Sequence, residues 1–445
     1  MSDSDRFPVL SPAGRALLQR LREHPHAPRY TAECGHRLTA ESLRRVRAFE
    51  AELRTTSPGW ARGGYPDWLP GFVDLCLTEV PFYRRYGDAP ARFEDLPAFD
   101  RADLSREPWA FVPDSQPLDG LIVNSTSGTT GHPLTILSHP VVGGCYTPLI
   151  KAALEAAGVT LTSGAGDVAC VLVGWQQQAY TYPSVTPQQA EAGHLKLNLH
   201  PGDWRDPDDR ARFLDDLNPE IYTGDPLAFA ELMRLGLKAR PKALVSTAMT
   251  LLPGLRRQLE AHFGCPVVDL YSMNESGPLA FRCGEADAFT LLHHRVYIEI
   301  LDPDGAPCPP GVRGEVTLTG GFNPFLPLLR YRTNDFAALE WRGPRPVLAG
   351  LEGRPPVTFR ARDGRRINNL DVTGALKPLA LPQYQLHQSA DGALRLRVRG
   401  RNTSPEALWA ALLDLFGPDQ ALTVEAVDSF DGSGGKVIQY TSDIV

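Results

Sequence analysis

The sequence lacks any apolar run near the ~20 residues that a membrane-spanning helix needs. Its first residues, MSDSDRF, lack the basic stretch and following apolar stretch of a signal peptide. It also lacks an excess of positive charge, since the formal net charge is -7. Nucleic-acid binding needs concentrated positive charge, so we expect no nucleic-acid partner. From the missing apolar run and the missing signal-peptide pattern we expect a cytoplasmic protein that does not bind membranes.

Cys-x-x-Cys motifs are absent as well, and lysines are few. The seven cysteines form no Cys-x-x-Cys pair and are odd in number, so we expect reduced, mostly buried thiols. Arginine supplies most of the 45 basic residues, and only six are lysine. A lysine in a distinctive context is therefore informative, and Lys436 in the glycine-rich segment GSGGK is one. We find no internal repeat.

The order of apolar patterns favours an α/β fold. About the first hundred residues have helical patterns, and one helix is expected to start at Ser11-Pro12. The middle of the chain alternates strands with amphipathic helices: a strand within 167–175, a helix within 250–264 closed by Gly264, and a strand within 265–272. Such alternation is typical of a core of parallel strands.

The texture changes after the middle of the chain. Short strands and turns over 296–342 predict a small β-rich subdomain. Beyond about residue 353, Asp391-Gly392 marks a hairpin, Ser404-Pro405 and Gly417 bound a helix, and 422–427 reads as a strand. We therefore predict a large N-terminal domain of αβ-layered subdomains over 1–352 and a small α+β C-terminal lid over 353–445.

The segment NSTSGTTGHP, residues 124–133, collects hydroxyl side chains and glycines between two strand-like runs. It is not a Walker A loop, which needs Gly-Lys-Ser/Thr and a helix directly behind it. Backbone N–H groups and Ser/Thr hydroxyls can nevertheless donate hydrogen bonds to phosphate oxygens. Taken alone, the segment fits a phosphate-binding loop and a Ser/Gly-rich surface loop equally well.

Companion motifs follow in a fixed order. They are YSMNESGP (271–278), GEVTLTG (314–320), RYRTND (330–335), EGR (352–354) and GSGGK (432–436). With PFYRRYGDAPARFEDLPAFDRADL (81–104), this set resembles the adenylate-forming acid–CoA ligases, and within them the phenylacetate–CoA ligase branch, over roughly residues 80–445. The resemblance implies a two-step reaction with ATP, Mg²⁺ and CoA: a carboxylate attacks the α-phosphate of ATP, and a thiol then captures the acyl-adenylate.

The resemblance also implies roles for individual residues. Tyr271 would pack on adenine, Glu275 would hold Mg²⁺, and Asp335 would accept hydrogen bonds from the ribose hydroxyls. Lys436 would bridge the acid and the α-phosphate. The other implied nucleotide-binding residues are Ser125, Thr126, Ser127, Gly128, Thr129, Thr130 and Gly131, together with Asp269, Ser272, Asn274 and Arg354.

Ordinary structural explanations remain for these residues. Tyr271 also fits a core tyrosine, Glu275 a charge at a helix start, and Lys436 a solvated tail residue. Arg332 is a weaker nucleotide candidate, because it also fits a surface ion pair with Asp335.

In the family that the sequence resembles, the acid pocket lies between the strand-turn that corresponds to the end of 167–175 and the segment before the Mg²⁺ motif. The resemblance therefore implies a pocket formed by Trp175, Tyr180, Tyr182, Ala248 and Met249. Aromatic and small side chains favour a flat ring over a long acyl chain. The three glutamines of 176–178 would bond polar ring substituents, or lie on a solvated loop.

The chain departs from the family at two places. Relatives build a zinc site from a cysteine, a histidine and a later Cys-x-Cys, whereas here Cys283 and His293 or His294 match only the first part. Even with Cys308 as a substitute the usual four ligands are not reached, so we expect no zinc. Pro355 and Pro356 also replace an acidic pair at the hinge and stiffen it.

These features favour an aryl acid–CoA ligase. The alternative is an adenylating enzyme of secondary metabolism that passes the acyl group to a carrier-protein thiol, an amine or a hydroxyl. A nucleotide-binding sensor or scaffold is a third reading, against which the retention of Glu275, Asp335 and Lys436 argues. Whether the protein forms a homodimer is left open.

Overall fold

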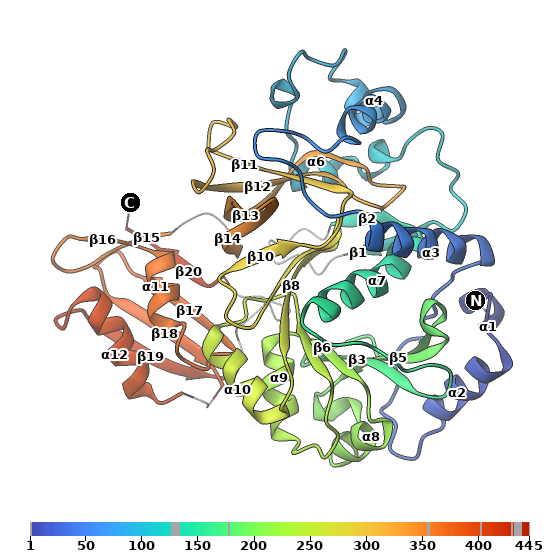
Figure 1. The fold of residues 1–445 in the computed structure, drawn as a ribbon. Coiled ribbons are helices and arrows are strands. Elements are labelled where there is room, and N and C mark those ends of the chain that lie inside the picture. Colours follow the sequence, from blue (N-terminus) through green and yellow to red (C-terminus); the bar gives the residue numbers. More distant parts are fainter. Residues whose placement is uncertain are drawn as a thin grey trace.

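A computed structural model of the protein describes residues 2–125, 134–176, 179–353, 357–400, 403–428, 430 and 438–444. Within these ranges the chain forms one large mixed sheet with helices around it and a smaller unit near the C-terminus (Figure 1). None of the helices in this part of the chain has the length and apolar character needed to cross a membrane.

The N-terminal region is helical, as its patterns predict. Ser11 caps the second helix by accepting a hydrogen bond from Gly14 N–H, with Pro12 at the first position. The elements are α1 (Asp3–Arg6), α2 (Pro12–Arg22), α3 (Ala40–Thr55), α4 (Leu69–Glu79), α5 (Pro81–Arg84), α6 (Arg101–Arg106) and the 3₁₀ turns η1 (Phe93–Asp95) and η2 (Pro108–Phe111).

Twelve strands form the large sheet, in the order β11-β12-β13-β14-β10-β9-β8-β7-β6-β3-β5-β4. They are β3 (Val168–Gly174), β4 (Tyr182–Thr186), β5 (Ala192–Asn198), β6 (Ile221–Gly224), β7 (Ala243–Ser246), β8 (Val267–Met273), β9 (Gly277–Cys283), β10 (Ala288–Leu291), β11 (Val296–Leu301), β12 (Arg313–Gly320), β13 (Leu328–Arg342) and β14 (Arg345–Gly353). The run from β5 to β8 is parallel, which confirms the α/β core.

The strands of 296–342 are not a separate sheet. They pair antiparallel, and β10 joins them to the parallel half by bonding β14 on one side and β9 on the other. Antiparallel pairing already begins between β8 and β9. The short strands and turns of 296–342 therefore lie within the antiparallel half of the sheet, where short turns suffice to join neighbouring strands.

Helices alternate with the strands of the parallel half along the chain. They are α7 (Pro140–Ala156), α8 (Asp209–Leu217), α9 (Pro226–Arg234) and α10 (Pro253–Phe263), with 3₁₀ turns η3 (Pro187–Gln189) and η4 (Pro201–Asp203). Gly264 ends α10 in the left-handed region at φ +68°, which confirms the predicted stop. The predicted strand pair around the hydroxyl-rich segment is also confirmed, because β1 (Ile122–Ser125) and β2 (Thr135–Ser138) pair antiparallel.

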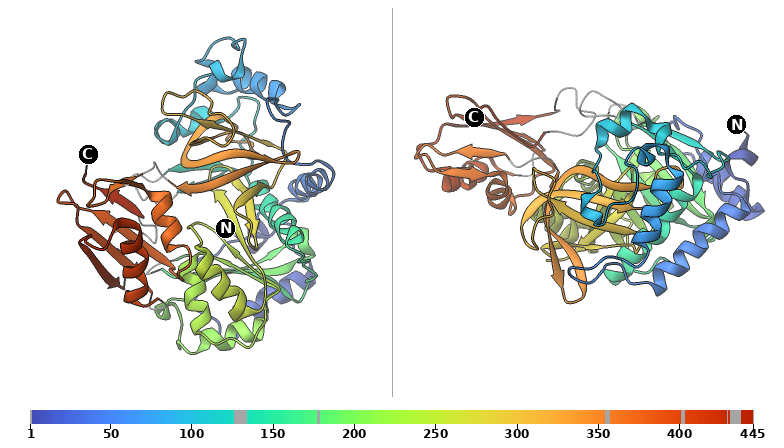
Figure 2. Two further views of the ribbon diagram at one scale, coloured as in Figure 1. Left: turned by 60° about the vertical axis from the view of Figure 1, so that its left-hand side comes forward. Right: turned by 90° about the horizontal axis from the view of Figure 1, so that it is seen from above.

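The C-terminal unit, defined here as the described residues from 357 to 444, lies to one side of the large sheet (Figure 2). It holds β15 (Thr358–Arg360), β16 (Arg366–Asn368), α11 (Asn369–Leu376), β17 (Gln383–Gln388), β18 (Leu394–Arg399), α12 (Pro405–Phe416), β19 (Leu422–Val427) and β20 (Tyr440–Ser442). The predicted hairpin is present as β17–β18, and Ser404 caps α12 as expected.

The C-terminal unit packs beside α9 and α10 (Figures 1 and 2). Leu252, just before α10, is a fully buried member of this unit's own apolar core. Gly254 N–H donates to Lys377 O over 2.8 Å, a second link between the two parts. β14 ends at Gly353, next to the predicted boundary. The division into two domains at that boundary stays a prediction.

Candidate active site

Tyr271 and Glu275 lie together where β8 turns into β9. The turn is tight, since Met273 pairs with Gly277 across it. Gly277 has φ +75°, and a Cβ there would come within 2.7 Å of the Phe322 ring and 3.0 Å of the Tyr146 ring. Glycine is therefore required at this position for two reasons, backbone conformation and space. The aromatic rings that close on Gly277 carry no motif, so sequence reasoning missed them.

Glu275 is 6% exposed and its carboxylate is held on one side only. The Tyr331 hydroxyl donates to Oε1 over 3.1 Å, and Arg101 Nη1 donates to the same atom over 3.2 Å. Both donors come from other elements, β13 and the start of α6. Sequence reasoning gave a role to neither residue, although both belong to the motifs that carry the family resemblance.

Tyr271 reaches the other carboxylate of the site. Its hydroxyl donates to Asp335 Oδ2 over 2.8 Å. Burial, and then the nearby Asp335 charge, raise the pKa of Tyr271 well above its usual value. The hydroxyl thus stays protonated and remains a donor. The structure thus brings the two predicted nucleotide residues Tyr271 and Asp335 into direct contact.

β13 carries both Tyr331, the partner of Glu275, and Asp335, the partner of Tyr271. Tyr331 and Asp335 are four residues apart, and Asn334 between them has φ +61°. Asparagine tolerates this left-handed conformation better than most residues. Arg332 pairs with Glu315, with Nε donating to Oε2 over 2.7 Å. The suggested surface ion pair between Arg332 and Asp335 is therefore wrong, because the guanidinium turns to a buried carboxylate on β12.

The remaining predicted residues on β8 and its turn have other surroundings. Asp269 is buried and accepts from Arg282 Nε over 2.9 Å. Burial raises the pKa of Asp269 to about 6, with Arg282 opposing the rise. Ser272 Oγ lies 2.9 Å from Thr247 Oγ1, which links the ends of β7 and β8. Asn274 is exposed in the turn. Their roles toward a nucleotide stay predictions.

The predicted acid-pocket residues divide into two groups. Ala248 and Met249 follow β7, directly beside β8 in the sheet. Tyr182 lies on edge strand β4, five strand positions from β8, which is about 24 Å at the usual strand spacing. Tyr180 is 72% exposed, and the Trp175 ring packs against His200. The structure therefore brings Ala248 and Met249 toward Glu275 but not Tyr180 or Tyr182.

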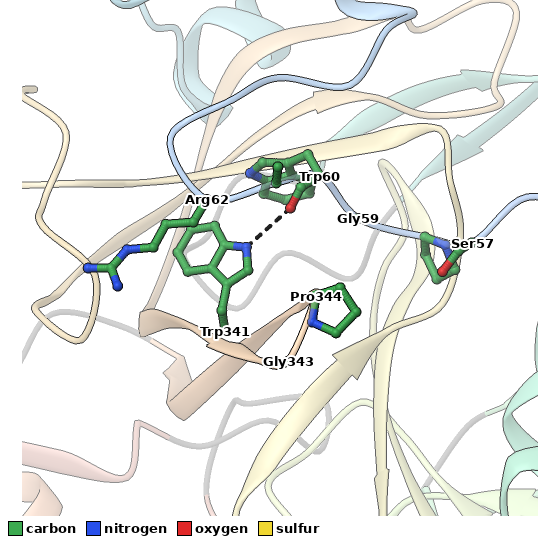
Figure 3. A pocket seen from close by; sticks show the side chains of 9 residues that line it. Ser57, Gly59, Trp60, Arg62, Trp341, Gly343 and Pro344 are labelled. Carbon is green, nitrogen blue, oxygen red and sulfur yellow. Dashed lines mark hydrogen bonds between the residues drawn. The ribbon is translucent and has the colours of Figure 1, made fainter.

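A cavity of about 660 Å³ lies elsewhere, between Ser57–Arg62 and the β13–β14 hairpin (Figure 3). Trp341 Nε1 donates to Trp60 O over 3.1 Å on its wall. Trp341 lies six residues along β13 from Asp335, or about 20 Å in an extended strand. This cavity is thus separate from the two carboxylates.

Several predicted residues lie outside the described ranges. They are Thr126, Ser127, Gly128, Thr129, Thr130 and Gly131 of the hydroxyl-rich segment, Arg354 and Lys436. Of Ser125 only the backbone is described, at the end of β1.

Glu275 is suited to bind magnesium because its carboxylate oxygen Oε2 accepts no hydrogen bond from the described residues. Among the described residues no donor contacts Oε2, whereas Oε1 has two. Mg²⁺ is commonly bound by one or two carboxylates plus substrate phosphates and water, so one oxygen left without a donor suits it. Within the described ranges no three His, Cys, Asp or Glu side chains cluster as a protein-only metal cage would require.

The zinc-related residues are spread along β9. Cys283 ends this strand, while His293 follows Leu292, whose N–H bonds Leu279 near the strand's start. Cys283 and Leu279 are four residues apart on β9, or roughly 13 Å along an extended strand, so Cys283 and His293 lie at different positions along it. The ring of His293 is buried with Nε2 unpaired among the described residues. The absence of zinc stays a prediction.

Comparison with known proteins gives likenesses in sequence and in fold. The family model described as "AMP-binding enzyme" matches residues 195–323. The phenylacetate-coenzyme A ligase of Aromatoleum evansii is 25% identical over 366 residues, which is 78% of this chain and 76% of the relative.

Among solved structures, 2-hydroxyisobutyryl-CoA ligase in the postadenylation state has a TM-score of 0.62 at 19% identity, covering 90% of both chains. An anthranilate CoA ligase in complex with anthranoyl-AMP has a TM-score of 0.50 at 16% identity, covering 76% of this chain and 70% of that one. At these identities the two solved structures show a likeness of fold.

Proposed function

Since the chain belongs to the adenylate-forming superfamily, we propose that it activates an aromatic carboxylic acid with ATP and transfers the acyl group to CoA. The observation that carries the proposal is the crossed pairing of two tyrosines and two carboxylates. Tyr271 holds Asp335, and Tyr331 holds Glu275, so four side chains of β8, its turn and β13 form one site.

Each of these side chains has a proposed task in the adenylation step. Tyr271 offers an aromatic face for adenine, and Asp335 beside it offers carboxylate oxygens to the ribose hydroxyls. Glu275 would hold Mg²⁺, which supplies positive charge to the phosphate oxygens during displacement. Lys436 would neutralise charge between the acid and the α-phosphate. The hydroxyl-rich segment after Ser125 would donate hydrogen bonds to the outer phosphates.

An aromatic acid is supported by two relatives and by the residues beside the site. The relative from A. evansii is named for phenylacetate, and the solved anthranilate CoA ligase holds anthranoyl-AMP. In this chain the Tyr146 and Phe322 rings close on Gly277, two residues after Glu275. Aromatic side chains at this distance suit a flat ring better than a flexible chain.

A different acceptor is the second candidate. Pro355 and Pro356 stand at the expected hinge, where the relatives carry an acidic pair. Proline restricts the backbone rotation that would turn the C-terminal unit toward a CoA site. A carrier-protein thiol, an amine or a hydroxyl would then receive the acyl group.

The test is acid-dependent exchange of pyrophosphate into ATP. We expect exchange with substituted benzoates or phenylacetates in the presence of Mg²⁺, and little with long-chain fatty acids. Adding CoA should give an acyl-CoA that mass spectrometry detects. Exchange with long-chain acids alone would refute the aromatic assignment. Exchange without any acyl-CoA would favour the other acceptors, and failure to bind AMP would refute the function as a whole.

A further inference from the structure

The two oxygens of the Glu275 carboxylate have different surroundings. Oε1 accepts hydrogen bonds from the Tyr331 hydroxyl and from Arg101 Nη1. No described side chain or backbone group donates to Oε2. The last torsion of a glutamate is broad and roughly two-fold, so an isolated carboxylate would exchange its oxygens freely. Two donors on one oxygen remove that freedom.

The two donors are fixed to a common frame. Phe99 N–H donates to Arg330 O over 3.2 Å, and Arg332 N–H donates to Phe99 O over 2.8 Å. These bonds bracket Tyr331 on β13 and place Arg101 two residues beyond Phe99. The Phe99 and Tyr331 rings also pack with centroids 5.1 Å apart. A displacement of one donor relative to the other would therefore break backbone hydrogen bonds.

Among the described residues, the Tyr331 hydroxyl donates its hydrogen bond to Glu275. The residue is 1% exposed, and its ring is part of the main apolar core. A buried hydroxyl costs free energy unless it finds a hydrogen-bond partner, and Glu275 Oε1 accepts from this one over 3.1 Å. A phenylalanine would fill the same core space without burying a hydroxyl. The polar atom is explained by the carboxylate that it contacts.

We propose that Tyr331 and Arg101 are positioning residues that anchor Oε1 of Glu275 and thereby present Oε2 to the divalent cation. The inference rests on the proposed function, which places that cation at Glu275. Partners of metal-binding carboxylates orient the ligand, and their loss typically weakens metal affinity about 10- to 100-fold. Tyr331 is the sharper test of the pair, because removing Arg101 also removes a competing positive charge.

The experiment compares Tyr331→Phe with wild type in Mn²⁺ binding, followed by electron paramagnetic resonance in the presence of ATP and without acid. We expect Mn²⁺ to bind about tenfold more weakly to the variant. The kcat of pyrophosphate exchange at saturating Mg²⁺ should change much less than the Mg²⁺ concentration needed for half-maximal rate. Such a split would not arise from a general loss of packing.

Tyr83→Phe is the matched control. The Tyr83 hydroxyl is also fully buried, but it donates to Pro327 O and accepts from Leu329 N–H, so its partners are backbone groups at the start of β13. Its loss should lower the melting temperature and leave Mn²⁺ affinity unchanged. Equal Mn²⁺ affinity in Tyr331→Phe and wild type would overturn the inference, as would an equal weakening in both variants.

Glu275→Gln separates this inference from the proposed function. If Glu275→Gln weakens Mn²⁺ binding and Tyr331→Phe does not, only the positioning role is refuted. If Glu275→Gln leaves Mn²⁺ binding unchanged, the cation is not at Glu275, and the metal assignment on which the inference rests is refuted as well.

Discussion

At the residue scale, the buried His293 makes the stability of the folded state depend on pH. Its ring is fully buried against Phe49 and Phe322, and burial lowers its pKa to about 3. The unfolded chain binds a proton at this residue near pH 6.5, while the folded chain does so only near pH 3. The unfolded state therefore holds one more proton between these values, and the folded state loses stability as the pH falls through that window.

We predict that His293→Gln reduces this loss. Between pH 6 and 5, one bound proton corresponds to about 1.4 kcal/mol per pH unit, and the fall in unfolding free energy should be smaller by that amount in the variant. Urea unfolding at several pH values measures it. His262→Gln, at an exposed position on α10, is the control. An identical pH slope in His293→Gln and wild type would contradict the prediction.

Lys436 is the residue-scale test of the chemistry. If it bridges the acid and the α-phosphate, Lys436→Ala should lower the rate of adenylation by about 10²-fold or more. Removing one preorganised electrostatic contact in other active sites has an effect of that order. It should spare acyl transfer from a pre-formed acyl-adenylate, because that step develops no charge at this position. Separate single-turnover assays of the two half-reactions decide the matter. Equal losses in both, or in neither, would leave Lys436 a tail residue.

At the element scale, β13 connects the site to the N-terminal region through a buried ion pair. Arg330 on β13 donates to Glu299 Oε2 on β11 over 3.0 Å, and both side chains are almost fully buried. Arg330 Nη1 also donates to Glu94 O, and a second bond goes to Leu96 O. The segment before Arg101 is thus tied to the strand that carries Tyr331 and Asp335.

Glu299→Gln should therefore be strongly destabilising. Removing one partner of a buried pair leaves an uncompensated charge and typically costs about 3–5 kcal/mol. Because β13 loses its anchor, the half-saturating Mg²⁺ concentration should rise as well. Glu107→Gln, in the exposed pair with Arg85, is the comparison and should cost about 1 kcal/mol or less. Thermal unfolding that shows equal shifts for both variants would refute the role of this pair.

At the scale of the whole molecule, the C-terminal unit contacts the large sheet through a place where only glycine fits. A Cβ on Gly254 would lie 2.5 Å from the carbonyl oxygens of Pro378 and Leu379. The Gly254 N–H bonds Lys377 O, and Leu252 inserts into the core of the unit. This close contact can form only when the C-terminal unit lies against the start of α10 as it does in this structure.

Gly254→Ala should loosen that arrangement without unfolding either part. We expect faster hydrogen exchange at Leu252 and at Lys377–Leu379, measured by mass spectrometry, and a change in the half-reaction that uses this arrangement. Gly143→Ala is the control, since this glycine of α7 has open space around its Cβ position. Unchanged exchange in Gly254→Ala would show that the contact does not hold the unit in place.

The sequence by itself determined much of the fold and the main residues of the candidate site. Apolar periodicity and capping residues predicted the parallel core, the stop of α10 at Gly264 and the start of α12 at Ser404. These are local properties, because caps and turns depend on neighbours within a few residues. Ordered motifs likewise nominated Tyr271, Glu275 and Asp335, although their roles await the experiments above.

Only the tertiary structure decided which side chains meet. Tyr331 and Arg101 lie far from Glu275 in sequence, and no spacing rule joins three separate elements at one carboxylate oxygen. The same limit explains the wrong partner suggested for Arg332, because its partner depends on the register between β12 and β13. Strand order, which places Tyr182 on the edge strand β4, could not be read from the sequence either. Register and strand order are set by long-range packing, because a shift of one residue turns every side chain to the opposite face.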